Sequence, residues 1–329
     1  MKVLLIQPKM RQRPMDTSLK ARMSPHLGLL TISGLLERAG HGVRVVNGNV
    51  EPVEIPSDVD LVGISVTVDV LPQAIELAKI CRAKGVRHIM FIDDNFIGDL
   101  AFARQLMEAM RPLRLKWNAA VSANIVDHPD LHDLMRETGC LSLFIGFESI
   151  SAGSVAGVHK RQNDVARYEK LVGMLHDRGI MINASFVFGL DSDGPSVFRD
   201  TLDWVVRNRI ETVTSHILTP YPGTALYERM KGEGRLTDTD LSHYDTAHVV
   251  FKPKGMSAEE LYAGYLWIYR EVYSWKNIIR RTPRSLSQFL PYYLFNLFYR
   301  KYGRFTERLG LAIGFDRVGA LARRLSYWR

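Results

Sequence analysis

The feature that most constrains the fold is a regular alternation of two kinds of segment. Short runs of β-branched and aliphatic residues, each long enough for one strand, alternate with stretches whose apolar residues recur at helical spacing. Strands separated by helices return by crossovers, so the sequence predicts an α/β protein with a mainly parallel sheet. The predicted strands are residues 2–8, 43–49, 59–66, 88–94, 116–122, 141–149, 180–189 and 212–220.

The stretches between these strands predict helices, most of which end at a glycine suited to the left-handed C-cap position. They are residues 27–40, 71–85, 99–110, 128–139, 164–179, 195–209 and 224–234. Ligands of parallel α/β folds bind at the carboxyl ends of the strands, which makes that rim the place to look for a site.

Polar side chains follow several of the predicted strands at this rim. Asp93, Asp94 and Asn95 end one apolar run, and Ser122 and Glu148 end two others. Such residues also form turns, cap helices or pair with neighbouring charges, so local chemistry alone leaves a structural role open. Their convergence on one rim favours a binding site.

Composition places the chain among soluble globular proteins. With 329 residues and 46% hydrophobic content it is long enough for one large or two ordinary domains. The apolar run at the N-terminus is too short for a signal peptide, and we therefore expect a cytoplasmic location. The two cysteines, Cys81 and Cys140, belong to no metal-binding spacing and are expected to be core residues, so no metal site is predicted.

An ordered set of motifs resembles one enzyme family. The segments "HIMFIDDNFIGD", "WNAAVSANIVDHPDLHDLMRETGCLSLFIGFESIS", "KRQN", "GIMINASFVFGLDSD" and "LTPYPGTALYERMKGEGRL" resemble successive elements of a radical S-adenosylmethionine (SAM) enzyme with an N-terminal cobalamin-binding domain. Residues 1–85 resemble the first half of that Rossmann-like cobalamin domain. The resemblance implies a partial (β/α) barrel at 86–256 that lacks its first, cluster-bearing strand, and a helical, basic C-terminal region at 257–329.

The resemblance also implies roles for rim residues. Asp93, Asp94 and Asn95 would hold the amino group of SAM, Glu148 the ribose hydroxyls, and Ser122 the pocket wall, while Lys160 would approach the SAM carboxylate. In the family, SAM, a [4Fe-4S] cluster and cobalamin together serve radical methylation or related C–H chemistry.

The chain departs from the family where the cluster should bind. It has no CxxxCxxC loop, and its two cysteines are 59 residues apart. The resemblance implies that the sequence is joined across a deletion near Gly85 and Val86, so we expect residues 61–66 to replace the lost barrel strand and pair with residues 89–92 in one merged sheet.

These observations lead to three hypotheses about function. In the first hypothesis, the chain is a relic or truncated form that keeps part of the SAM pocket, binds SAM weakly and is inactive in radical chemistry. In the second, it is an active enzyme whose cluster is ligated in an unusual way or by residues of a partner. The third hypothesis is a peripheral membrane protein.

The third hypothesis rests on residues 276–329, which hold 12 lysines and arginines against two acidic residues, interleaved with aromatic residues. Such a segment suits an anionic membrane surface at the inner face of the membrane. Packing of the aromatic residues against the barrel is the alternative interpretation, and no specific nucleic-acid partner is indicated.

Overall fold

The structure is a computed structural model, and it describes residues 1–9, 27–66, 70–86, 88–151, 153–154 and 164–299. All eight predicted strands are present, so that part of the prediction is confirmed. They are β1 (Lys2–Gln7), β2 (Gly42–Asn47), β3 (Leu61–Ile64), β4 (His88–Met90), β5 (Lys116–Ser122), β6 (Cys140–Glu148), β7 (Met181–Phe188) and β8 (Thr212–Ile217).

The seven predicted helices are also present, and three more follow them. The predicted ones are α2 (Leu27–Arg38), α3 (Leu71–Ala83), α4 (Leu100–Met110), α5 (Pro129–Glu137), α7 (Tyr168–Asp177), α8 (Val197–Arg207) and α9 (Ala225–Gly232). The C-terminal helices are α10 (Ala258–Val272), α11 (Trp275–Arg280) and α12 (Leu286–Tyr299). Glycines with positive φ follow α2, α3, α5, α7 and α9, as expected, whereas Arg209 (φ 52°) takes that conformation after α8.

The chain divides into two compact units. The N-terminal unit contains residues 1–89 and 100–116, and the half-barrel unit contains residues 90–99 and 117–329. The N-terminal unit includes α4 although this helix follows β4 in sequence, and the expected junction at Gly85 and Val86 stays a prediction.

In the N-terminal unit, a three-stranded parallel sheet has the order β2-β1-β3. The central strand β1 is apolar on both faces because helices cover both: Leu4 and Ile6 pack with Leu77 of α3, and Val3 and Leu5 pack with Leu29 of α2.

The expected pairing of residues 61–66 with 89–92 is wrong. Among the described residues, β3 is bonded to β1 in register Val3↔Leu61, while β4 lies in a different sheet. The physical reason is that β1, buried on both faces, gains a second neighbour from β3, so β3 completes the N-terminal sheet.

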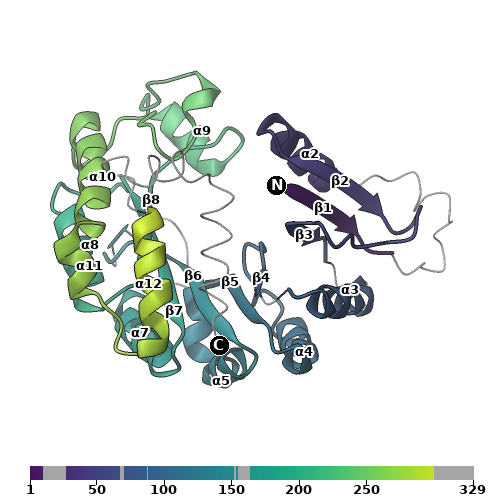
Figure 1. Ribbon diagram of the computed structural model, residues 1–329. Coiled ribbons are helices and arrows are strands. Elements are labelled where there is room, and N and C mark those ends of the chain that lie inside the picture. Colours follow the sequence, from purple (N-terminus) through teal and green to yellow (C-terminus); the bar gives the residue numbers. More distant parts are fainter. Residues whose placement is uncertain (10–26, 67–69, 87, 152, 155–163, 300–329) are drawn as a thin grey trace. The chain divides into compact units, whose positions relative to one another are not determined.

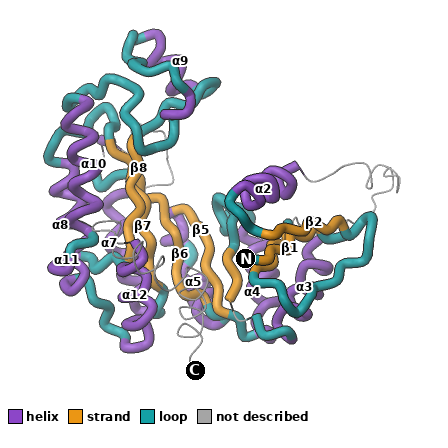
Figure 2. Tube along the Cα trace, turned by 45° about the horizontal axis from the view of Figure 1, so that its top comes forward, coloured by secondary structure: helices purple, strands orange, loops and turns teal. Residues whose placement is uncertain are grey.

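The second sheet has the order β4-β5-β6-β7-β8, and all of it except residues 88–89 and 116 belongs to the half-barrel unit. The pairings β5–β6, β6–β7 and β7–β8 are parallel, and Figure 2 shows the curved row of strands with helices along its outer side. The core between strands and helices is aromatic: Phe147 and Phe186 contact Trp204 of α8, and Tyr168 of α7 packs on Phe147. The predicted α/β fold with a partial parallel barrel is confirmed.

Of the C-terminal helices, α10 packs against β8 and α8 within the half-barrel unit (Figure 1). Tyr292 of α12 is fully buried, and its hydroxyl donates to the Ile278 carbonyl at 2.5 Å. Part of the aromatic segment therefore packs against the protein, although Phe289 on the same helix is 47% exposed. Within the part of the chain that the structure describes, no helix has the length and hydropathy needed to span a membrane.

Candidate functional site

Side chains of the half-barrel alternate between an apolar convex face and a more polar concave face. On β5, Trp117, Ala119 and Val121 are buried under helices, while Asn118, Ala120 and Ser122 are only partly buried. The strand register aligns the second set with its neighbours in rows across the sheet. One row is Ala120, Phe144, Asn183 and Thr212, and the next is Ser122, Gly146, Ser185 and Thr214.

The loop after β4 is fixed to the end of β5 by an amide. The Asn95 Oδ1 accepts a hydrogen bond from the Ser122 backbone N–H at 3.1 Å, and the Phe96 N–H donates to the Ala120 carbonyl at 2.8 Å. The Phe96 ring packs 5.2 Å from that of Trp117. The structure therefore brings two predicted site residues, Asn95 and Ser122, into direct contact, and the Asn95 side-chain oxygen has a structural partner.

Asp93 and Asp94 lie in the same loop with exposed side chains, and both border a cavity on the concave face. Their proposed contact with the SAM amino group stays a prediction. Lys160, the other predicted contact to SAM, lies outside the described residues.

Glu148 ends β6 in a conformation that disfavours any residue but glycine. Its φ is 65°, and the ladder to β7 shifts register between Gly146 and Glu148. A Cβ added to Gly146 would lie 2.8 Å from the Glu148 Oε1, so a larger residue at 146 would require the end of the Glu148 side chain to move from its present position. Because such strain is retained where surrounding structure and function require it, this rim position is a candidate binding position.

The cavity itself was not predicted from the sequence. Its volume is about 440 Å³, and its wall runs from residues 90–94 across the concave face to Tyr292 and Phe295 of α12. The signal that could have located it is the small or polar residue at every second position of β5, which leaves the concave face hollow opposite Phe144.

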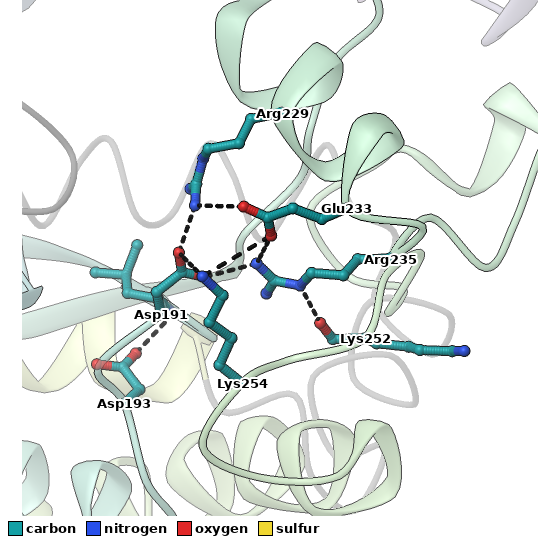
Figure 3. Close-up of polar contacts among 8 residues, drawn as sticks. Asp191, Asp193, Arg229, Glu233, Arg235, Lys252 and Lys254 are labelled. Carbon is teal, nitrogen blue, oxygen red and sulfur yellow. Dashed lines mark hydrogen bonds and ion pairs between the residues drawn. The ribbon is translucent and has the colours of Figure 1, made fainter.

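A second polar cluster lies beyond the end of β7, where Asp191 meets Arg229, Arg235 and Lys254 (Figure 3). Burial raises the pKa of Asp191, but hydrogen bonds from the three cations outweigh burial and lower it to about 2.

The adjacent Asp193 is buried and serves the loop. Its carboxylate accepts hydrogen bonds from the Gly189 and Leu190 backbone N–H groups and from the Ser154 hydroxyl. The turn at residues 191–194, with the sequence DSDG, therefore stabilises the rim through backbone and side-chain contacts.

The cysteines do not fit an iron–sulfur cluster. Cys81 packs among Leu4, Ile6 and Leu77 in the N-terminal unit, and Cys140 is buried at the start of β6, at the opposite end of that strand from Glu148. Burial raises the pKa of both thiols, which disfavours the thiolate form that ligates iron. Among the described residues, no group of three potential ligands is placed to hold a metal ion.

The fold and the site define a class: an α/β protein with a curled parallel sheet and a polar concave face. Curated relatives narrow the class. The chain is 36% identical over 64% of its length to bacteriochlorophyllide d C-12(1)-methyltransferase of Chlorobaculum tepidum, covering 46% of that protein. It is 28% identical over 49% of its length to hopanoid C-2 methylase of Rhodopseudomonas palustris, covering 31% of that protein.

Among solved structures, the chain is similar to the radical SAM methyltransferase TsrM of Kitasatospora setae, with 17% identity, a TM-score of 0.45, and coverage of 50% of this chain and 34% of that one. Residues 224–329 match a family described as a domain of unknown function, DUF4070. The curated relatives are methyltransferases and a cyclase, and the family resemblance seen in the sequence is confirmed, while the internal deletion stays a prediction. The chain spans about half the length, or less, of the curated relatives that it matches.

Proposed function

We propose that the half-barrel unit binds the adenosine part of SAM or of S-adenosylhomocysteine and does not cleave SAM reductively. Its curated relatives are methyltransferases and a cyclase, which gives the proposal its ligand class. The two buried cysteines supply no set of three thiolates, so the proposed function includes no reaction that needs an iron–sulfur cluster.

The observation that carries the proposal is the conformation of Glu148. A carboxylate at the carboxyl end of a parallel strand is suited to accept hydrogen bonds from both hydroxyls of a ribose. The left-handed backbone costs about 1 kcal/mol, and Gly146 leaves the space that the carboxylate fills. Without iron to chelate the amino and carboxylate groups, we expect weak binding.

Calorimetric titration with S-adenosylhomocysteine tests the proposal. We expect a saturable heat for the natural chain and at least about tenfold weaker binding for Glu148→Gly, because a charged acceptor of hydrogen bonds is lost. Arg209→Gly is the matched control, since it relieves the same backbone strain after α8. Binding should be unchanged in that control, and the absence of heat at millimolar ligand would contradict the proposal.

A further inference from the structure

The concave-face cavity has features of a ligand site that extends from the loop after β4 away from Ser122 and Glu148. It lies entirely within the half-barrel unit, and its volume of about 440 Å³ is in the range of small-molecule pockets. Ser122 and Glu148 are not among the residues that line it, whereas Asp93 and Asp94, the predicted contacts to the SAM amino group, are. A ligand here would leave the predicted ribose contact free.

Large apolar side chains face this cavity without being covered by protein. Phe144 on β6 is 36% exposed, Phe295 on α12 is 37% exposed, and Ile92 after β4 is 87% exposed. The register explains the space between them: Phe144 lies between Ala120 on β5 and Asn183 on β7, and the small Ala120 leaves one side of its ring open. Aromatic walls on two elements suit a ring-bearing ligand.

One polar atom specifies a further property of the ligand. The Asn118 Oδ1 is buried, and it has no hydrogen-bond partner in the described part of the chain. Buried acceptors are normally paired, and leaving one unpaired costs free energy. A ligand with an N–H or O–H group would supply the missing donor.

The charges around the cavity exclude one class of ligand. The lining side chains include Asp93, Asp94 and Glu211 but no lysine or arginine. The Glu211 carboxylate accepts a hydrogen bond from the Ile182 N–H at 2.8 Å and pairs with His176. An anionic ligand would meet only negative charge here, and because Glu211 is already paired and Asp93 and Asp94 are exposed to solvent, we take the ligand to be neutral.

We propose that this cavity is a second binding site, for a neutral aromatic small molecule that carries a hydrogen-bond donor. Phe295 would then determine specificity, which assigns a ligand-binding role to part of the segment matched as a domain of unknown function. The site goes beyond adenosine binding and does not depend on it.

Fluorescence titration of the full chain with N-phenyl-1-naphthylamine tests this site, because that probe is neutral, aromatic and has one N–H donor. We expect saturable binding at one site, weakened roughly fivefold or more by Phe295→Ala through loss of a buried aromatic contact. Phe289→Ala is the matched control, since Phe289 lies on the same helix, is 47% exposed and does not line the cavity. Equal weakening by both variants, or no saturable signal, would overturn the proposal.

Two further measurements define the site. Ala120→Leu should abolish probe binding by filling the cavity, with an unchanged circular-dichroism spectrum as the check on folding. Competition by 1-phenylnaphthalene, which lacks the N–H group, should be roughly tenfold weaker than that of the amine, and Asn118→Leu should remove the difference. Stoichiometric displacement of the probe by S-adenosylhomocysteine would show that both ligands share one site, which would contradict the second-site proposal. Failure of S-adenosylhomocysteine to bind would contradict only the proposed function.

Discussion

Asp191 lies where three basic side chains converge beyond β7, and the contacts explain its acidity. Arg229 donates a hydrogen bond to it at 2.6 Å and Arg235 at 2.9 Å, with the Lys254 ammonium 3.3 Å away. The Arg235 side chain is only 9% exposed, so its charge depends on this carboxylate and on Glu233 for compensation. The cluster joins the β7 end to α9 and the segment that follows it.

This arrangement predicts a pH-dependent contribution to stability. Because the pKa of Asp191 is lowered from 3.8 to about 2, its stabilisation is present above about pH 4 and is lost as the pH falls toward 2. We expect Asp191→Asn to lower the free energy of unfolding by about 2 kcal/mol at pH 6 and by about 1 kcal/mol at pH 3, measured by urea denaturation.

The control for this prediction is Asp133→Asn, which removes the partner of Arg178 at a carboxylate whose side chain is 56% exposed. Its effect should be much smaller, because solvent screens the pair. A loss for Asp191→Asn that is the same at both pH values would contradict the assigned pKa.

At the scale of single residues, the sequence predicts chemistry better than geometry. Asn95, Ser122 and Glu148 were selected because polar groups follow apolar strands, and the structure places all three at strand ends or in the adjoining loop. The positive φ of Glu148 and its close approach to Gly146 could not be predicted, because they arise from a register shift between two strands.

At the scale of elements, the outer edge of β8 is closed by side chains instead of another strand. The Tyr273 hydroxyl donates to the Val213 carbonyl at 2.7 Å and accepts from the Val213 N–H at 3.0 Å. Tyr269, one turn earlier on α10, makes the same pair of hydrogen bonds to Ser215. An edge strand otherwise exposes unpaired backbone groups, so these two tyrosines protect the sheet.

Removing one of these hydroxyls should destabilise the half-barrel unit. Tyr273→Phe leaves the buried N–H and carbonyl of Val213 without their partner, and we expect a loss of about 2 to 3 kcal/mol in guanidinium denaturation. Tyr262→Phe on the same helix, at a side chain that is 46% exposed, should change stability by less than about 0.5 kcal/mol. Equal losses in the two variants would show that the edge contacts contribute little.

Strands and helices were predictable because periodicity and glycine caps are local signals. The partner of a strand is not local: β3 has the apolar composition that either sheet would accept, and β1, far away in sequence, determines its place. The concave cavity was missed for the same reason, because Phe295 of α12 approaches β6 only after the C-terminal helices pack.

At the scale of the whole molecule, the curated relatives include methyltransferases, while the two cysteines of this chain are buried in different units. The proposed adenosine contact is Glu148 at the strand-end rim, and the two cysteines do not make up a set of three thiolates for a cluster. We therefore infer that this chain binds adenosine without carrying out radical chemistry on SAM.

Anaerobic reconstitution of the full chain with iron and sulfide tests this separation most directly. The measured quantities are iron and acid-labile sulfide after desalting, together with reductive cleavage of SAM by dithionite-treated protein. We predict substoichiometric iron that Cys81→Ala and Cys140→Ala leave unchanged, and no cleavage of SAM. Retention of about four irons per chain with reductive cleavage of SAM would contradict the account.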